Sequence, residues 1–327
     1  MHVLITGAAG MIGRKLLERL ARDGGLNGGA VDTLTLTDIV APNAPAGLSA
    51  KVVLKTADLA EPGIAEDLVK DRPDVVFHLA AIPSGGSETD FEAGYRANLD
   101  GTRNLLEAIR KTGDGYKPNV IYTSSIAVYG APFPPSIPDD FILTPLTSYG
   151  AHKVICETML ADYNRRGFLN GVGVRLCGIT VRPGKPNLAA SGFYSGIIRE
   201  PLAGLEATLP VSEDVTNTHA SPRAAAGFLV HAASLKPEQL GHRINMTMPG
   251  VCCTVGEQLA ALRRVAGDRV ADRVKRQPDP FIMKIVEGWP SRFDCTRARE
   301  LGFTAESSFD EIIRVHIEDD LGGNFVR

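Results

Sequence analysis

The chain has 327 residues, of which 44% are hydrophobic and 22% charged, a balance typical of a globular protein with a sizeable core. Its formal net charge of −3 gives no reason to expect nucleic acid or an anionic membrane as partner. No apolar run approaches the roughly 20 residues that span a bilayer, and the N-terminus lacks the basic region and cleavage site of a secretory signal.

The five cysteines are odd in number and scattered, and none belongs to a Cys-x-x-Cys pair. They are Cys156, Cys177, Cys252, Cys253 and Cys295. This pattern argues against a disulfide framework and against a zinc site. We therefore expect buried thiols, no bound metal, and a cytoplasmic protein.

Short β-branched runs alternate with longer helical patterns through the first half of the chain. Strands are predicted at residues 2–6, 33–37, 51–54, 75–78, 120–124 and 172–176, and helices at 11–22, 90–112 and 149–166. Such alternation indicates an α/β fold, namely a Rossmann-type doubly wound parallel sheet with helices on both faces.

A glycine loop lies between the first predicted strand and the first predicted helix. Gly7, Gly10 and Gly13 recur at every third position, and Met11 and Ile12 begin the helix. Glycines allow a tight turn and close approach of the backbone to a pyrophosphate, and the helix N-terminus offers free N–H groups. The loop therefore predicts a dinucleotide site.

Two acidic residues follow the next strands. Asp38 ends the second strand, where a carboxylate accepts hydrogen bonds from the adenosine ribose hydroxyls. It would repel a 2′-phosphate, and no lysine or arginine follows within the next few positions, so NAD is predicted rather than NADP. Asp58 and Leu59 follow the third strand and could flank the adenine, with the carboxylate near its amino group.

A serine, a tyrosine and a lysine form the predicted catalytic group. Tyr149 and Lys153 lie four residues apart on a predicted helix and so share one face, while Ser125 ends a strand. A tyrosine has an ordinary pKa of about 10, so it needs nearby positive charge to act as a base near neutral pH. Lys153 and an oxidised nicotinamide would supply that charge, and Ser125 would hydrogen-bond the same substrate oxygen. Lys153 is also expected to anchor the nicotinamide ribose.

The pattern changes beyond about residue 177, where prolines and glycines cluster and the helices become shorter. Residues 221–234 predict one more helix that covers the sheet, and residues 243–247 predict a further strand. We expect an NAD-binding domain over residues 1–180, with late elements from about 218 to 248. Residues 181–327 are expected to be mainly a substrate-binding lobe interleaved with it.

Together these residues resemble the extended short-chain dehydrogenase/reductase family. Over residues 1–180 the resemblance also rests on His78-Leu79-Ala80-Ala81, Asn98-x-x-Gly101-Thr102 and Ser124-Ser125-x-x-Val128-Tyr129-Gly130. It implies that Leu79, Ala80 and Ala81 line the cofactor, that Asn98 lies near the nicotinamide, and that Ser125, not Ser124, is catalytic. We also expect Ile179 to contact the cofactor. The resemblance further implies a homodimer in which helices 90–112 and 149–166 form a four-helix bundle.

The chain departs from the nucleotide-sugar epimerases and dehydratases of this family after residue 177. Their Asn-Val-Tyr-Gly-Pro segment, whose Asn touches the sugar diphosphate, is replaced by residues 177–184. Their Arg-Asp-Phe-x-His-Val-x-Asp segment becomes residues 215–222, which keep only His219. Residues 181–187 and 191–202 instead resemble D-erythronate dehydrogenases, the branch that oxidises the C2 hydroxyl of a four-carbon sugar acid with NAD.

A carboxylate substrate requires one or two cations near the catalytic group. Arg182 and Lys185 lie on the loop that leaves the sheet, Arg223 could serve instead, and Arg175 is expected to support the sheet edge. The sequence thus predicts an NAD-dependent dehydrogenase of a small sugar acid, with oxidation of D-erythronate to 2-oxo-D-erythronate favoured. The alternative is a nucleotide-diphosphate-sugar epimerase or dehydratase with tightly bound NAD. The exact acid, its stereochemistry and the cation that binds it stay open.

Overall fold

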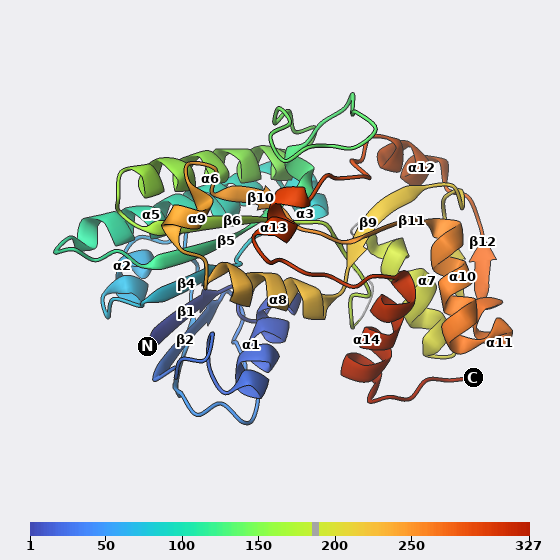
Figure 1. The fold of residues 1–327 in the computed structure, drawn as a ribbon, viewed down its shortest axis with the longest axis horizontal. Coiled ribbons are helices and arrows are strands. Elements are labelled where there is room, and N and C mark those ends of the chain that lie inside the picture. The colour runs from blue at the N-terminus through green and yellow to red at the C-terminus, as the bar shows by residue number, and fades with distance from the viewer. Residues whose placement is uncertain (185–189) are drawn as a thin grey trace.

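A seven-stranded parallel sheet forms the centre of the computed structural model, which describes residues 1–184 and 190–327 (Figure 1). The strand order is β10-β6-β5-β4-β1-β2-β3. The strands are β1 (His2–Thr6), β2 (Thr33–Asp38), β3 (Lys51–Thr56), β4 (Val75–His78), β5 (Asn119–Ser125), β6 (Asn170–Leu176) and β10 (Asn245–Thr247). The chain order reverses between β1 and β4, which is where ligands bind in doubly wound sheets.

Helices cover both faces of this sheet, as the apolar runs of its strands require. On one face lie α1 (Met11–Asp23) and α8 (Pro222–Ala232), and on the other α2 (Ile64–Val69), α5 (Gly101–Thr112) and α6 (Ser148–Arg165) (Figure 1). Every residue of β4 is buried, as expected for a strand packed on both sides. The predicted strands are confirmed to within two residues at each end, and so are three of the four predicted helices.

The fourth predicted helix, over residues 90–112, is not one regular helix. It divides into α4 (Phe91–Tyr95), a π-helical turn (Arg96–Asp100) and α5. The wider turn places the Asn98 side chain against the loop after β4, where its Oδ1 accepts a hydrogen bond from the Ile82 N–H at 2.7 Å. π-turns of this kind often mark functional positions, and no sequence periodicity reveals them.

The C-terminal half adds a smaller lobe beyond the carboxyl ends of the strands, at the right of Figure 1. It holds a three-stranded sheet, β11-β9-β7, and a two-stranded sheet, β12-β8. The strands are β7 (Gly178–Ile179), β8 (Ala207–Leu209), β9 (Thr216–Ala220), β11 (Val251–Thr254) and β12 (Val274–Arg276). Its helices are α7 (Gly192–Leu202), α10 (Val255–Ala266), α11 (Asp268–Ala271), α12 (Pro280–Glu287) and α14 (Phe309–Leu321). The predicted fold class is confirmed.

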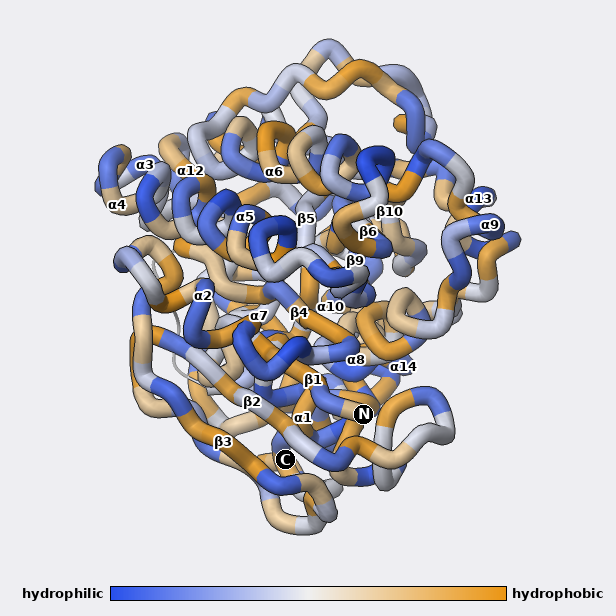
Figure 2. The backbone as a smooth tube through the Cα atoms, turned by 90° about the vertical axis from the view of Figure 1, so that its left-hand side faces the viewer, coloured by the Kyte–Doolittle hydropathy of each residue, from blue (hydrophilic) through white to orange (hydrophobic). Residues whose placement is uncertain are grey.

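Three short helices and a 3₁₀ turn complete the described chain. They are α3 (Ser84–Thr89), α9 (Pro237–Leu240), α13 (Thr296–Glu300) and the 3₁₀ turn Ile126–Val128. Figure 2 shows apolar stretches in central strands such as β4, and apolar and polar residues alternating along the helices that cover the sheet. Each lobe has its own apolar core, the larger one around the parallel sheet and the smaller one between α7, α10 and α14.

A buried ion pair joins the sheet to helix α6. Arg175 on β6 binds both carboxylate oxygens of Glu157, at 2.9 and 2.8 Å, and both side chains are almost fully buried. The Arg175 Nη1 also donates to the Tyr129 hydroxyl at 2.7 Å. Removing one member of such a pair strands a buried charge, so this arginine is structural. Arg175 therefore joins β6 to α6, and its support of the sheet edge stays a prediction.

Candidate active site

Most of the predicted site residues gather at the carboxyl edge of the parallel sheet. Gly7 follows β1, Asp38 ends β2, Leu79 follows β4 and Ser125 ends β5. Neighbouring parallel strands end at one edge, so these residues share one side of the molecule. The smaller lobe faces the same edge because the chain passes from β6 directly into β7.

The glycine loop is shaped by close backbone contacts. Gly7 has a φ of +72°, and a Cβ there would lie 2.6 Å from the Ala80 nitrogen. A Cβ on Gly13 would lie 2.4 Å from the Gly7 carbonyl oxygen. Gly10 precedes α1 and is exposed, and no side chain of the described residues caps this helix. The first amides of α1 are therefore open to an anion such as a phosphate.

Asp38 and the loop after β4 flank the glycine loop on either side. The Asp38 carboxylate accepts a hydrogen bond from the Ala9 N–H at 2.9 Å and remains partly exposed. Leu79 and Ala80 are partly exposed and Ala81 is exposed. Asn98 holds the far end of that loop, through the Ile82 N–H and the Ile82 carbonyl, to which it donates at 3.1 Å.

Asp58 already has a strong partner. Its Oδ2 pairs with the Arg96 guanidinium at 2.7 Å, and its Oδ1 accepts from the Ala60 N–H at 2.8 Å. Arg96 also reaches Glu61, and both acids raise the pKa of the arginine, Asp58 the more strongly. Leu59, next in the chain, is buried in the core. A contact of the Asp58 carboxylate with adenine stays a prediction.

The two adjacent serines have different surroundings. Ser124 is buried and its hydroxyl donates to Glu157 at 2.5 Å. Ser125 is partly exposed, and its Oγ accepts a hydrogen bond from the Ala127 N–H at 3.1 Å. Ser125 therefore keeps its own proton available for a ligand at the sheet edge, whereas the hydroxyl of Ser124 is used within the fold.

Tyr149 and Lys153 lie on α6 beside this edge. The Lys153 ammonium is 5.4 Å from the centre of the Tyr149 ring and 4.7 Å from that of Tyr122. It donates to the Thr123 carbonyl at 2.6 Å and is buried, while Tyr149 is partly exposed. The buried ammonium is therefore fixed close to the ring of Tyr149.

Arg182 follows β7, on the smaller lobe. Its Nε donates to the Ile179 carbonyl at 3.1 Å and its Nη2 to the Ser191 hydroxyl at 3.2 Å. Burial lowers the pKa of the guanidinium, the nearby Tyr149 raises it, and the nearby Arg199 lowers it. Among residues 1–184 and 190–327 no carboxylate lies within ion-pair distance of it. Arg182 is thus a partly buried cation near Tyr149 that has no acidic partner among the described residues.

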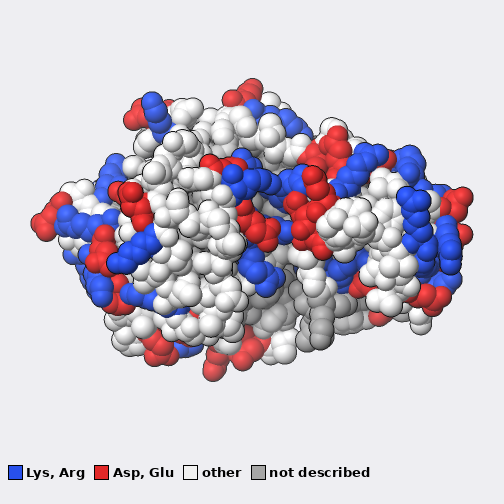
Figure 3. Space-filling view, turned by 90° about the horizontal axis from the view of Figure 1, so that it is seen from below, with Lys and Arg blue, Asp and Glu red and all other residues white. Residues whose placement is uncertain are grey.

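The other proposed substrate cations are placed differently. Arg223 on α8 binds Asp319 and Glu318 of α14, and these hydrogen bonds raise the pKa of its guanidinium. Figure 3 shows acidic and basic side chains interspersed in this way on the face seen from below. Lys185 lies outside the described residues. Ile179 is buried at the end of β7.

Several residues that contact the predicted site residues were not themselves predicted from the sequence. His152 is fully buried next to Lys153, and its Nδ1 accepts a hydrogen bond from Asn98 at 3.2 Å. Arg96, Ser191 and Arg199 likewise contact predicted site residues. Arg199 carried a visible signal, because it and Glu200 are the two charged residues of the mainly apolar helix α7.

The family of the chain follows from comparison with known proteins. A model of the NAD dependent epimerase/dehydratase family matches residues 3–218. The chain belongs to this family. The extended short-chain dehydrogenase/reductase resemblance is therefore confirmed, and the chain is an NAD-dependent enzyme of that group.

Individual members of the family are similar over nearly the whole chain. The D-erythronate dehydrogenase of Cupriavidus necator is 47% identical over 98% of both chains. That of Haemophilus influenzae is 39% identical over 98% of this chain and all of its own. A solved structure described as the nucleoside-diphosphate-sugar epimerase from Agrobacterium tumefaciens is 60% identical, covers 99% of this chain and 95% of its own, and has a TM-score of 0.97.

The geometry of the edge fits the NAD that defines the family. The glycine backbone at positions 7 and 13, where a Cβ would collide with neighbouring atoms, leaves the start of α1 free for a pyrophosphate. Asp38 lies where the adenosine ribose would be bound. Among the described residues there is no cluster of three metal-binding side chains, and no helix there is long and apolar enough to cross a membrane.

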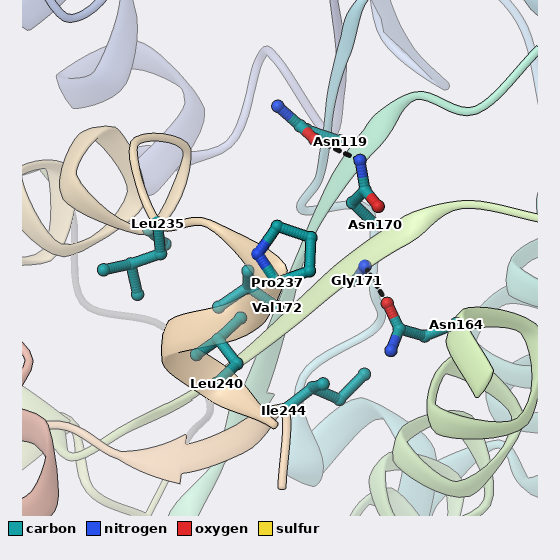
Figure 4. Close-up of a pocket in the computed structure, with 10 residues that line it drawn as sticks. Asn119, Asn164, Asn170, Gly171, Val172, Leu235, Pro237, Leu240 and Ile244 are labelled. Carbon is teal, nitrogen blue, oxygen red and sulfur yellow. Dashed lines mark hydrogen bonds between the residues drawn. The ribbon is translucent and has the colours of Figure 1, made fainter. Parts of the chain in front are cut away.

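A small cavity elsewhere in the main domain does not compete with this edge. It has a volume of about 10 Å³ and lies near the amino ends of β5 and β6, between Asn119, Asn170, Leu240 and Ile244 (Figure 4). The Asn170 amide donates to the Asn119 amide oxygen at 3.0 Å there. A space of this size holds one water molecule, not a substrate.

Proposed function

We propose that this protein oxidises the C2 hydroxyl of a small sugar acid, with D-erythronate as the first candidate and 2-oxo-D-erythronate as its product. The observation that carries the proposal is Arg182, a partly buried cation beside Tyr149 with no acidic partner among the described residues. A substrate carboxylate would satisfy that charge and present its C2 hydroxyl to the tyrosine. The similarity to D-erythronate dehydrogenases over the full length supports the same substrate class.

Ser125, Tyr149 and Lys153 are the proposed catalytic residues. Tyr149 would take the proton of the C2 hydroxyl, and Ser125 would donate a hydrogen bond to the same oxygen and orient it. Lys153, held by the Thr123 carbonyl, would keep positive charge near the tyrosine throughout. NAD, when bound, accepts the hydride released from C2.

The proposed cofactor contacts follow the carboxyl edge of the sheet. The pyrophosphate would meet the backbone at Gly7, Gly10, Met11, Ile12 and Gly13, and Asp38 would bind the adenosine ribose in preference to a 2′-phosphate. Asp58 and Leu59 are proposed beside the adenine. Leu79, Ala80, Ala81, Asn98 and Ile179 are proposed along the rest of the cofactor, with Tyr149 and Lys153 at its nicotinamide ribose.

A nucleotide-sugar epimerase or dehydratase is the second candidate, favoured by the description of the Agrobacterium tumefaciens relative. Against it stands the segment 177–184, which replaces the Asn-Val-Tyr-Gly-Pro segment of such enzymes and contains no asparagine. His219 also offers no contact to a nucleotide, because it is fully buried and bonded to Thr180 and Gln258. We therefore rank the sugar-acid dehydrogenase first.

The two candidates differ in whether reduced cofactor accumulates. With purified protein and added NAD, we expect D-erythronate to produce a rise in absorbance at 340 nm, and UDP-sugars to produce none. If UDP-sugars are converted without net formation of NADH, and sugar acids are not oxidised, the protein is a nucleotide-sugar epimerase or dehydratase instead. Related four-carbon and five-carbon acids, assayed in parallel, would define the exact substrate and its stereochemistry.

We also propose a homodimer formed through α5 and α6. Helix α6 is apolar on both sides, since Cys156 and Leu160 are buried while Ile155 is 37% exposed and Met159 partly exposed. An Ile155→Glu variant should therefore elute at half the wild-type mass in light-scattering chromatography. Leu205→Glu, at another exposed apolar position, is the matched control and should stay dimeric. A monomeric wild type would refute the dimer.

A further inference from the structure

Three residues on one face of helix α7 form hydrogen bonds with Arg182. Ser191 immediately precedes the helix. Ser195 and Arg199 lie within the helix, and each is four residues after the previous member, so the three side chains share a face. The Ser191 hydroxyl accepts from Arg182 Nη2 at 3.2 Å, and the Ser195 hydroxyl accepts from the Arg182 N–H at 3.0 Å. Arg199 Nη1 donates to the Arg182 carbonyl at 2.7 Å. We call these three residues the α7 clamp.

The clamp holds the main chain and the side chain of Arg182 at once. Ser195 and Arg199 bind its amide and its carbonyl, while Ser191 binds one end of its guanidinium. Ser195 is 1% exposed and Arg199 11% exposed, so water competes little for these bonds. A buried network whose members are all bonded fixes one conformation.

The charge of Arg199 is balanced by Glu200, the next residue in the chain. Two guanidinium groups lie near each other here, and Arg199 lowers the pKa of Arg182. Glu200 binds Arg199 Nη2 at 2.5 Å and neutralises it. His219, which bonds to Thr180 in the same segment, adds no charge, because burial and then Arg182 lower its pKa to about 3. Among the described residues the charge of Arg182 is therefore left for a ligand.

We propose that Ser191, Ser195 and Arg199 are positioning residues that hold Arg182 in the geometry needed to recognise the substrate carboxylate. This inference rests on the proposed function, since it assigns to α7 the selection of an acid over a neutral polyol. The clamp residues touch Arg182 and not the reacting atoms, so their loss should weaken substrate binding and leave the chemical step intact.

The test uses Ser195→Ala, a small change at a buried position, and Arg199→Lys, which keeps the charge facing Glu200. Each should raise KM for the sugar acid about three- to tenfold at nearly constant kcat, the effect of weakening one or two hydrogen bonds. KM for the corresponding neutral amide should not change. Arg273→Gln is the matched control, because Arg273 donates to the α7 carbonyl of Pro201 without touching Arg182.

A second measurement separates the clamp from the proposed function. The Arg182 amide, bonded to Ser195, should exchange its hydrogen about tenfold faster in Ser195→Ala and at the wild-type rate in Arg273→Gln. If the wild type oxidises no sugar acid, the proposed function is wrong. If the Arg182 amide then also exchanges at the wild-type rate in Ser195→Ala, the α7 clamp is wrong as well. If wild type oxidises the acid but both clamp variants keep its KM, the clamp alone is wrong.

Discussion

Replacing Tyr149 with phenylalanine is expected to lower kcat by about a hundred- to ten-thousandfold, the contribution of a positioned general base. The change removes one oxygen from a partly exposed ring and leaves the helix and the Lys153–Thr123 bond in place. NAD affinity should stay within about threefold, because the proposed phosphate and adenosine contacts lie on other elements. Cofactor binding by calorimetry and turnover at 340 nm measure the two effects separately.

Tyr163→Phe provides the matched control for this experiment. Tyr163 lies on the same helix, and its hydroxyl donates to Glu107 at the far end from Tyr149. The same atom is therefore lost from the same helix, and activity should remain near that of wild type. A Tyr149→Phe enzyme that keeps turning over would show that another group takes the proton.

The parallel sheet was predictable because short strand patterns alternate with helical ones, and because β4 is a continuous apolar run that needs cover on both faces. In the structure β1, β4 and β5 lie side by side with their carboxyl ends together, which brings Gly7 and Ser125 to one edge. The choice of Ser125 over Ser124 came from resemblance. The structure adds a physical difference, since Ser124 donates to the buried Glu157 whereas Ser125 is partly exposed.

Other parts of the site depend on contacts that no local pattern carries. Arg96 meets Asp58 across 38 positions, and only the π-helical turn that also places Asn98 brings them together. The smaller lobe is likewise irregular in sequence, since its strands pair over long separations, as β9 does with β11. Arg182 and Arg223 looked equivalent as loop and helix cations. Their difference lies in Glu318 and Asp319 of α14, which pair with Arg223 and not with Arg182.

That difference leads to the second large prediction. Arg182→Gln should lower kcat/KM for the sugar acid about ten- to two-hundredfold, the loss of a charged hydrogen bond worth about 1.5–3 kcal/mol. Most of the effect should appear in KM, because the carboxylate is bound alike before and during hydride release. With a neutral amide of the same acid as substrate, wild type and variant should differ little.

Arg223→Gln distinguishes the two cations directly. Its guanidinium binds Asp319 and Glu318, so the change should cost some stability through the contact of α8 with α14 and leave KM for the acid unaltered. In the reverse outcome, Arg223→Gln would raise KM for the acid and Arg182→Gln would not. The substrate carboxylate would then bind at α8, and the main support for a sugar-acid substrate at Arg182 would be lost. Equal indifference of both variants would instead favour a substrate without a carboxylate, and with it the nucleotide-sugar reaction.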